Sequence, residues 1–188
     1  MILYTLQPSE ALKEIEETGT FRCDAAKSFN LSKRDSLREE YRWLMEKMRQ
    51  KIGKEPEGVT YPVWAWYKWE YENQCPDVNS AAFLQRNEDK VLFTLEVPEN
   101  EALLTDFEAW QFVLMHTFVM KEEEEDFIEV DGLSEEELEE KIQNSWDNVF
   151  DVREVRGTDY TRGRFVQATF WEIKKEYILD KKVYERTI

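Results

Sequence analysis

The sequence predicts a single α+β domain over residues 1–188, with a mixed or antiparallel sheet packed by three to four helices. Several short segments alternate apolar and polar residues, which is the period of a half-buried strand. Other segments repeat apolar residues at the spacing of a helix that buries one face. Of the 188 residues, 41% are hydrophobic and 14% aromatic, enough to form a core. No repeat or linker divides the chain, so one domain is expected.

The chain opens with a predicted strand and a predicted helix. Residues 2–6 are mostly apolar and favour a short strand. A helix is expected from Pro8, because proline fits the first helical position and apolar residues follow at helical spacing. Gly19 is expected to end that helix, and residues 21–24 to form an extended piece.

A second and longer helix is predicted after a polar loop. It is expected to begin near Ser32, where Ser32 and Asp35 offer capping groups, and to end at Gly53. Its apolar residues recur at helical spacing, which predicts a buried face. These residues are Leu37, Tyr41, Leu44, Met45, Met48 and Ile52.

The most distinctive segment is residues 61–69, which contain three of the seven tryptophans. In a strand, Trp64 and Trp66 project from one face, while Val63 and Ala65 project from the other. A core needs only one of these faces. The other would present indole rings, and flat aromatic surface binds nucleobases, nicotinamides and sugars.

The middle of the chain predicts a strand followed by a third helix. Residues 90–97 alternate strictly between apolar and polar positions, and a proline follows them. Thr105 and Asp106 are expected to cap a helix that buries residues as far as Phe118. That helix would contain His116, which is interpreted as making an ordinary contact on the helix surface.

Residues 121–154 carry −12 of the formal net charge of −16, and the rest of the chain is near balance. We predict that they form an acidic helical segment, inserted into the domain. Ser134 and Glu137 have the spacing of a capping box, and Leu133 and Leu138 that of a hydrophobic staple. The helix would carry a narrow apolar stripe of Leu138, Ile142, Trp146 and Val149.

The last part of the chain predicts one further strand. Residues 165–173 are strongly strand-forming, after a loop at 157–163. The terminal stretch that contains Tyr177 and Tyr184 is either extended or helical, because its periodicity does not decide between them.

Composition excludes several classes of protein. No apolar run is long enough for a membrane helix, and the first residues lack the features of a secretion signal, so a cytoplasmic protein is expected. Cys23 and Cys75 are therefore expected to be free thiols. The acidic balance argues against direct binding to nucleic acid or to anionic lipid.

The sequence predicts neither a metal nor a cofactor. Two cysteines and the single histidine, His116, do not form a zinc pattern. There is no P-loop and no Gly-x-Gly-x-x-Gly fingerprint. Sequence motifs therefore leave open whether the protein is an enzyme.

Blocks spread along nearly the whole chain resemble DUF3841, a bacterial family without an established activity. They are Leu3–Gln7 (LYTLQ), Gly19–Asp24 (GTFRCD), Tyr61–Tyr67 (YPVWAWY), Leu104–Trp110 (LTDFEAW) and Gln167–Ile173 (QATFWEI). The acidic segment matches none of these blocks, and we expect the family to vary there.

The blocks share aromatic residues beside polar groups that a pure core would not need. If their strands are neighbours, these residues would converge on one polar pocket lined by tryptophans, the usual form of a small-molecule site. The candidate ligand-binding residues are Thr5, Gln7, Arg22, Trp64, Trp66, Asp106, Trp110, Gln167, Thr169 and Trp171. Alternatively, Gln167 and Thr169 pair across strands, Arg22 bonds Asp106 or Glu172, and the tryptophans fill the core.

Three functions remain open at this level. The first is a binding domain for a nucleotide-like small molecule. The second is an enzyme, because the opening strand, helix and glycine are similar to the first element of ADP-ribosyltransferase-like domains. That similarity implies Thr5 or Gln7 as the early residue and Glu172 as the catalytic glutamate, which would stabilise an oxocarbenium-like centre. The third is an interaction protein, such as an adaptor or inhibitor, that docks a basic protein partner on the acidic helix.

Overall fold

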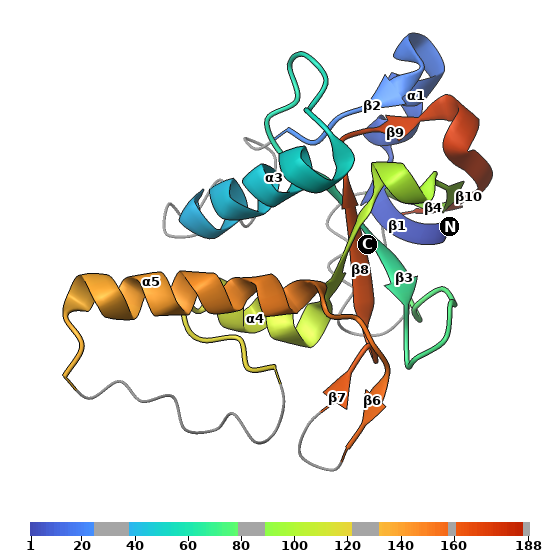
Figure 1. The fold of residues 1–188 in the computed structure, drawn as a ribbon. Helices are drawn as coiled ribbons and strands as arrows, with labels where there is room; N and C mark the ends of the chain where they lie inside the picture. Colours follow the sequence, from blue (N-terminus) through green and yellow to red (C-terminus); the bar gives the residue numbers. More distant parts are fainter. Residues whose placement is uncertain (25–37, 79–88, 122–131, 158–160, 186–188) are drawn as a thin grey trace.

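The computed structural model describes residues 1–24, 38–78, 89–121, 132–157 and 161–185, and it has an α+β fold (Figure 1). Its centre is a six-stranded sheet in the order β10-β4-β1-β3-β8-β5. Every neighbouring pair is antiparallel, which resolves the choice between a mixed and an antiparallel sheet. The strands are β1 (Ile2–Pro8), β3 (Val63–Lys68), β4 (Lys90–Glu96), β5 (Leu103–Asp106), β8 (Val166–Phe170) and β10 (Ile178–Tyr184).

Helices and two small ribbons surround this sheet. The α-helices in the described ranges are α1 (Glu10–Thr18), α3 (Arg38–Ile52), α4 (Phe107–Leu114) and α5 (Glu135–Ser145). Single 3-10 turns occur at η2 (Glu99–Glu101), η4 (Trp146–Phe150) and η5 (Lys175–Tyr177). The ribbons pair β2 (Thr20–Phe21) with β9 (Ile173–Lys174), and β6 (Val155–Arg156) with β7 (Thr161–Arg162).

The two faces of the sheet carry two separate cores. On one face, Leu3, Phe93 and other apolar residues of the central strands pack with Ile15 of α1. On the other face, Trp110 of α4 packs with residues of α3 and η4. Figure 1 accordingly shows α3, α4 and α5 together on one side of β8, with α1 apart from them. Because both faces are covered, alternate residues of a strand such as β3 enter different cores.

The opening strand and helix agree with the sequence prediction except at their junction. Pro8 is the last residue of β1, and Ser9 precedes the helix, so proline does not occupy the first helical position. The helix ends at Gly19, whose φ of 86° is left-handed. The backbone of Cys23 pairs with that of Tyr61 in an isolated antiparallel β-bridge. The thiols of Cys23 and Cys75 form no disulfide.

The tryptophan strand and the strand at 90–97 are confirmed, and the longer helix is confirmed from Arg38. Its buried face includes Tyr41, Leu44 and Met48, as the spacing predicted. The expected capping residues Ser32 and Asp35, together with Leu37, lie outside the described residues.

The third helix is shorter than predicted. Asp106 caps it as expected, by accepting a hydrogen bond from the Ala109 amide at 2.9 Å. The helix ends at Leu114, however, and His116 has a φ of 53°, which no α-helix accommodates. His116 is therefore not inside a helix, and both of its ring nitrogens contact glutamates from other elements.

The capping box at Ser134 and Glu137 is present at the start of α5. The helix gives way to η4, where Trp146 and Val149 are fully buried in the second core. The end of the acidic segment thus anchors α5 to the domain. Residues 122–131 lie outside the described ranges.

The strand predicted at 165–173 is interrupted. β8 ends at Phe170, and Trp171 and Glu172 form the turn that leads to β9. Trp171 therefore does not share a strand face with Gln167 and Thr169. None of the helices in the described part of the chain is both long and apolar enough to cross a membrane.

Candidate functional site

A hollow of about 250 Å³ lies where the turn after β8 meets the loop after α3. Aromatic and charged side chains line it together. The lining residues are Ile52, Lys54, Pro56, Glu101, Phe170, Trp171, Glu172, Lys174 and Tyr177. Segments from three distant parts of the sequence therefore form this candidate site.

Backbone contacts hold the turn that forms the floor of the hollow. Phe170 and Ile173 are buried in the first core on either side of the turn. The indole Nε1 of Trp171 donates to the backbone oxygen of Gly53 at 2.9 Å, which ties the turn to the end of α3. Beyond β9, the Lys175 amide donates to the Gly19 oxygen at 2.9 Å. The lining side chains thus project from a fixed backbone.

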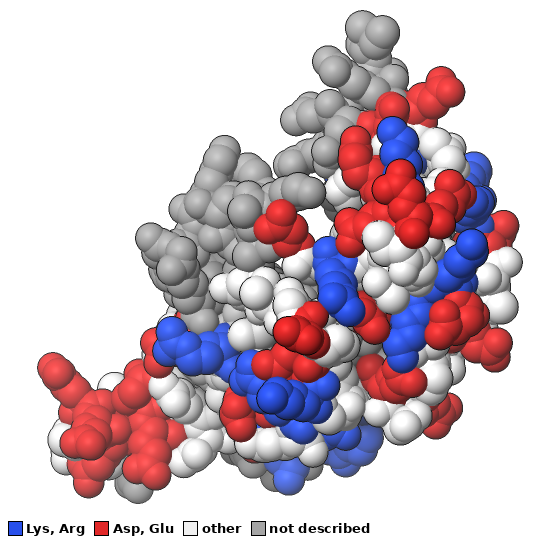
Figure 2. Space-filling model, turned by 90° about the horizontal axis from the view of Figure 1, so that it is seen from above, with Lys and Arg blue, Asp and Glu red and all other residues white. Residues whose placement is uncertain are grey.

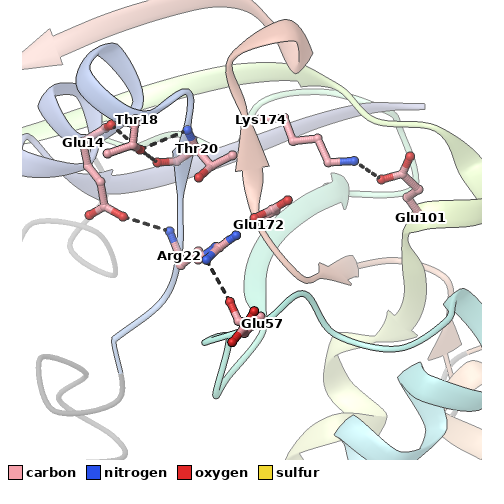
Figure 3. A network of polar contacts seen from close by, with 8 residues as sticks. All are labelled: Glu14, Thr18, Thr20, Arg22, Glu57, Glu101, Glu172 and Lys174. Atoms are coloured by element: carbon pink, nitrogen blue, oxygen red, sulfur yellow. Dashed lines mark hydrogen bonds and ion pairs between the residues drawn. The ribbon is translucent and has the colours of Figure 1, made fainter.

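Arg22 and Glu172 form an ion pair at one side of the hollow (Figure 3). The Nε of Arg22 donates to Oε2 of Glu172 at 2.9 Å, and its Nη1 donates to the backbone oxygen of Glu57 at 2.9 Å. The Glu172 side chain is 10% exposed, whereas that of Arg22 is 40% exposed. Glu172 lines the hollow, and Arg22 balances its negative charge.

Glu101, Lys174 and Tyr177 form a second polar group at the other side (Figure 3 shows Lys174 and Glu101). A single carboxylate oxygen of Glu101 accepts from Lys174 Nζ at 2.8 Å and from the Tyr177 hydroxyl at 2.5 Å. These hydrogen bonds lower the pKa of Glu101 below its usual range. The pKa of Tyr177 is raised, first by burial and then by the nearby carboxylate. At neutral pH the group is therefore an ionised carboxylate held by two donors.

The predicted tryptophans do not line this hollow. Trp64 and Trp110 pack in the second core with their ring centroids 5.4 Å apart, and Tyr41 stands edge-on to both. Burial raises the pKa of Tyr41 to about 12. Trp66 lies farther along β3, 5.1 Å from the Phe107 ring. Trp64 and Trp110 therefore belong to the core, as the alternative interpretation expected, whereas Trp66 is half-buried against Phe107 and Trp69 and belongs to neither core.

The polar residues of the predicted pocket lie on opposite faces of the sheet. Trp66 pairs with Tyr4 of β1, so Thr5 and Gln7 project from the other face. Gln167 and Thr169 share the tryptophan face, because they pair with Trp66 and Trp64. The predicted set therefore does not converge on one pocket.

Two of these polar residues have local partners. The hydroxyl of Thr169 donates across the strands to the Leu103 oxygen at 3.3 Å. Asp106 is buried and accepts backbone hydrogen bonds from Ala109 at 2.9 Å and Gly163 at 2.7 Å. From the predicted list, only Trp171 lines the hollow, with Arg22 held against it through Glu172.

The geometry gives the ADP-ribosyltransferase hypothesis no complete site at this hollow. Glu172 lines it, but Thr5 and Gln7 do not. Thr5 donates instead to the Trp64 oxygen at 2.7 Å, and Gln7 donates to the Thr5 hydroxyl at 2.8 Å. The volume of about 250 Å³ is also below the range of ~300–1,000 Å³ usual for ligand pockets, which favours a ligand fragment over a dinucleotide.

Sequence reasoning missed Lys54, Glu101, Lys174 and Tyr177. Glu101 and Lys174 are 73 positions apart, and neither lies in a motif. The available signal was weak: polar residues beside the strand ends at 98–101 and 173–177.

Comparisons with known proteins place the chain in a family without indicating a ligand. The family model described as a domain of unknown function (DUF3841) matches residues 2–179. No curated protein and no solved structure matches the chain.

Proposed function

The chain belongs to the family described as a domain of unknown function (DUF3841), and from that premise we propose that it binds a nucleotide-like small molecule in the hollow beside Trp171. The observation that carries this proposal is the composition of the lining. Three aromatic rings meet two lysines and two glutamates in one concave site. Apolar walls with a few placed polar groups are the usual form of a small-molecule site.

The size and chemistry of the hollow support a ligand with one planar ring system. Its volume of about 250 Å³ suits a nucleobase or nucleoside, with further groups extending into solvent. The rings of Trp171, Phe170 and Tyr177 supply apolar contact, and base-to-aromatic contact contributes ~1–3 kcal/mol per base. The charged groups would orient the ligand's polar edge.

Tryptophan fluorescence tests this proposal. We expect nucleosides or nucleotides to quench emission saturably, and we expect Trp171→Phe to lose that response. Trp43→Phe is the matched control, because Trp43 stacks on Phe150 and does not line the hollow. Calorimetry on the same panel would detect binding that leaves fluorescence unchanged. Absence of binding by both methods, or quenching that survives Trp171→Phe, would contradict the proposal.

A second function, docking of a basic protein partner, is favoured by the acidic end of α5. Figure 2 shows acidic side chains covering the end of the molecule that projects beyond the rest. Glu135, Glu136 and Glu140 are exposed there. Such a local field speeds association with a basic partner and makes it dependent on salt.

Substitution is a better test of this surface than deletion, because α5 also holds His116 through Glu139. We expect Glu135→Lys with Glu136→Lys and Glu140→Lys to abolish capture of a lysine-rich peptide at low salt. The control, Glu96→Lys, changes an exposed acidic residue on β4. Equal capture by both proteins would rule out this docking surface.

A further inference from the structure

We infer that Lys174 and Tyr177 form the seat for a phosphate group of the ligand, and that the Glu101 carboxylate occupies this seat until the ligand displaces it. This inference rests on the proposed function and specifies which chemical group is recognised and how the site is regulated. Its basis is the geometry of the three side chains, their unequal exposure and the charge that remains around them.

The two donors point at one acceptor position. Lys174 Nζ and the Tyr177 hydroxyl both donate to Oε2 of Glu101, at 2.8 and 2.5 Å. One oxygen held by an ammonium and a hydroxyl is also how a phosphate oxygen would be held. Because all three residues line the hollow, the acceptor position is within reach of a ligand bound there.

The donors are fixed in place. Tyr177 is 6% exposed and belongs to the first core. Lys174 lies on β9, which pairs with β2, and its ammonium group stands 5.1 Å from the centre of the Tyr177 ring. The seat would therefore keep its shape without Glu101.

The acceptor is held less firmly. The Glu101 side chain is 41% exposed and projects from a 3-10 turn of three residues. An ion pair this exposed contributes little, because water and salt screen it. Glu101 is thus able to turn into solvent when a stronger anion arrives.

The remaining charges favour a doubly charged anion. Glu172 is balanced by Arg22, so it adds little repulsion. Lys54 lines the same hollow, is exposed and forms no ion pair with the residues that the structure describes. Once Glu101 leaves, Lys54 and Lys174 are the two cations that line the hollow, in a chain of net charge −16. The two negative charges of a phosphate monoester dianion would balance the positive charges of both lysines.

The test compares Glu101→Gln with Glu99→Gln. Both replace a carboxylate in η2 by an amide of the same size, but Glu99 does not line the hollow. The probes are inorganic phosphate, AMP and adenosine, titrated by calorimetry. We expect Glu101→Gln to bind phosphate and AMP about two- to fivefold more tightly than the unmodified protein, and to bind adenosine unchanged. Glu99→Gln should match the unmodified protein with every probe.

Lys174→Met supplies the converse measurement, since it removes the cation but keeps the length of the side chain. We expect its affinity for AMP to fall to that for adenosine. Circular dichroism and urea unfolding would show that each variant is folded, and a variant that fails this check is replaced by Lys174→Gln.

The outcomes separate the two proposals. If adenosine and AMP bind equally and Glu101→Gln changes neither, the nucleotide-like site stands and the phosphate seat is overturned. If phosphate binds and tightens in Glu101→Gln while adenosine does not bind, the seat stands and the nucleotide-like ligand is wrong. If no probe binds to any variant, both proposals fail.

Discussion

The imidazole of His116 lies with Nδ1 3.0 Å from Oε1 of Glu40, a carboxylate whose side chain is only 3% exposed. On the other side of the ring, Nε2 lies 2.9 Å from Oε1 of Glu139. The His116 side chain therefore links α3 to α5 through its contacts with the carboxylates of Glu40 and Glu139. The other oxygen of Glu40 is buried without a hydrogen-bond partner in the part of the chain that is described.

This arrangement predicts that stability depends on pH through His116. The hydrogen bond to Glu40, followed by the contacts with Glu139, raises the pKa of His116 above 6.5 although burial opposes the shift. Because the folded pKa is the higher one, this stabilisation is complete below about pH 6.5 and is lost as pH rises through the folded value. We expect the free energy of unfolding to decline over that window.

His116→Asn isolates this contribution, since asparagine tolerates the φ of 53°. We expect the variant to lose about 1–3 kcal/mol at pH 6, where Glu40 would be left without its partner, and less at pH 8.5. Urea unfolding between these values measures both. The same pH slope in both proteins would show that His116 does not carry the effect.

Among the helix-capping residues, we expect substitution of Asp106 to reduce stability the most. It holds the first turn of α4 and the Gly163 amide with different oxygens, at 2.9 and 2.7 Å. Asp106→Ala loses the cap and leaves a buried amide unpaired, so we expect a cost of about 2–4 kcal/mol in urea unfolding. Asp180→Ala, on the exposed face of β10, should change stability by less than about 0.5 kcal/mol. Equal effects would contradict the assignment.

Gly163 and Gly132 form a matched pair for a steric prediction. Both have a positive φ, of 67° and 84°. A Cβ at Gly163 would lie 2.7 Å from the Val152 oxygen, whereas one at Gly132 would meet none of the described residues within 4 Å. We expect Gly163→Ala to lower the free energy of unfolding, measured in urea, by about 1–3 kcal/mol more than Gly132→Ala does. Similar losses would mean that backbone strain alone decides the outcome.

The Arg22–Glu172 pair should contribute a small, salt-sensitive coupling. Because Arg22 is 40% exposed, solvent screens the interaction, and we expect a coupling energy of about 0.2–1 kcal/mol. A double-mutant cycle with Arg22→Met and Glu172→Gln measures it, and 1 M NaCl should reduce it. A coupling that is unchanged by salt would indicate that the hydrogen bond, rather than the charge, is responsible.

Several strands and the caps at Asp106 and Ser134 were predictable because their signals are local. Alternation identified β4, and the pairing of Ser134 with Glu137 identified the start of α5. The end of α4 was not predictable, because the apolar spacing continues to Phe118 without a glycine or proline. Contacts of His116 with Glu40 and Glu139, which are distant in sequence, accompany the break in the helix.

The candidate site was predictable only in part, for a related reason. Alternation shows which residues of one strand share a face, but it does not show how neighbouring strands align. A shift of one residue moves Thr5 from the face of Trp66 to the opposite face. The sequence left Asp106 and Glu172 as possible partners of Arg22, and the structure pairs it with Glu172, whereas Glu101 and Lys174 meet only through the folded topology.

The position of β1 in the middle of the sheet has a consequence for synthesis of the chain. β1 leaves the ribosome well before its partners β3 and β4, which begin at residues 63 and 90. β3 in turn needs β8, which ends at Phe170. Open strand edges therefore persist until residue 170 has been made, and such non-local pairing folds slowly and favours aggregation of unfinished chains. Truncation before β8 should yield an insoluble product rather than a smaller folded domain.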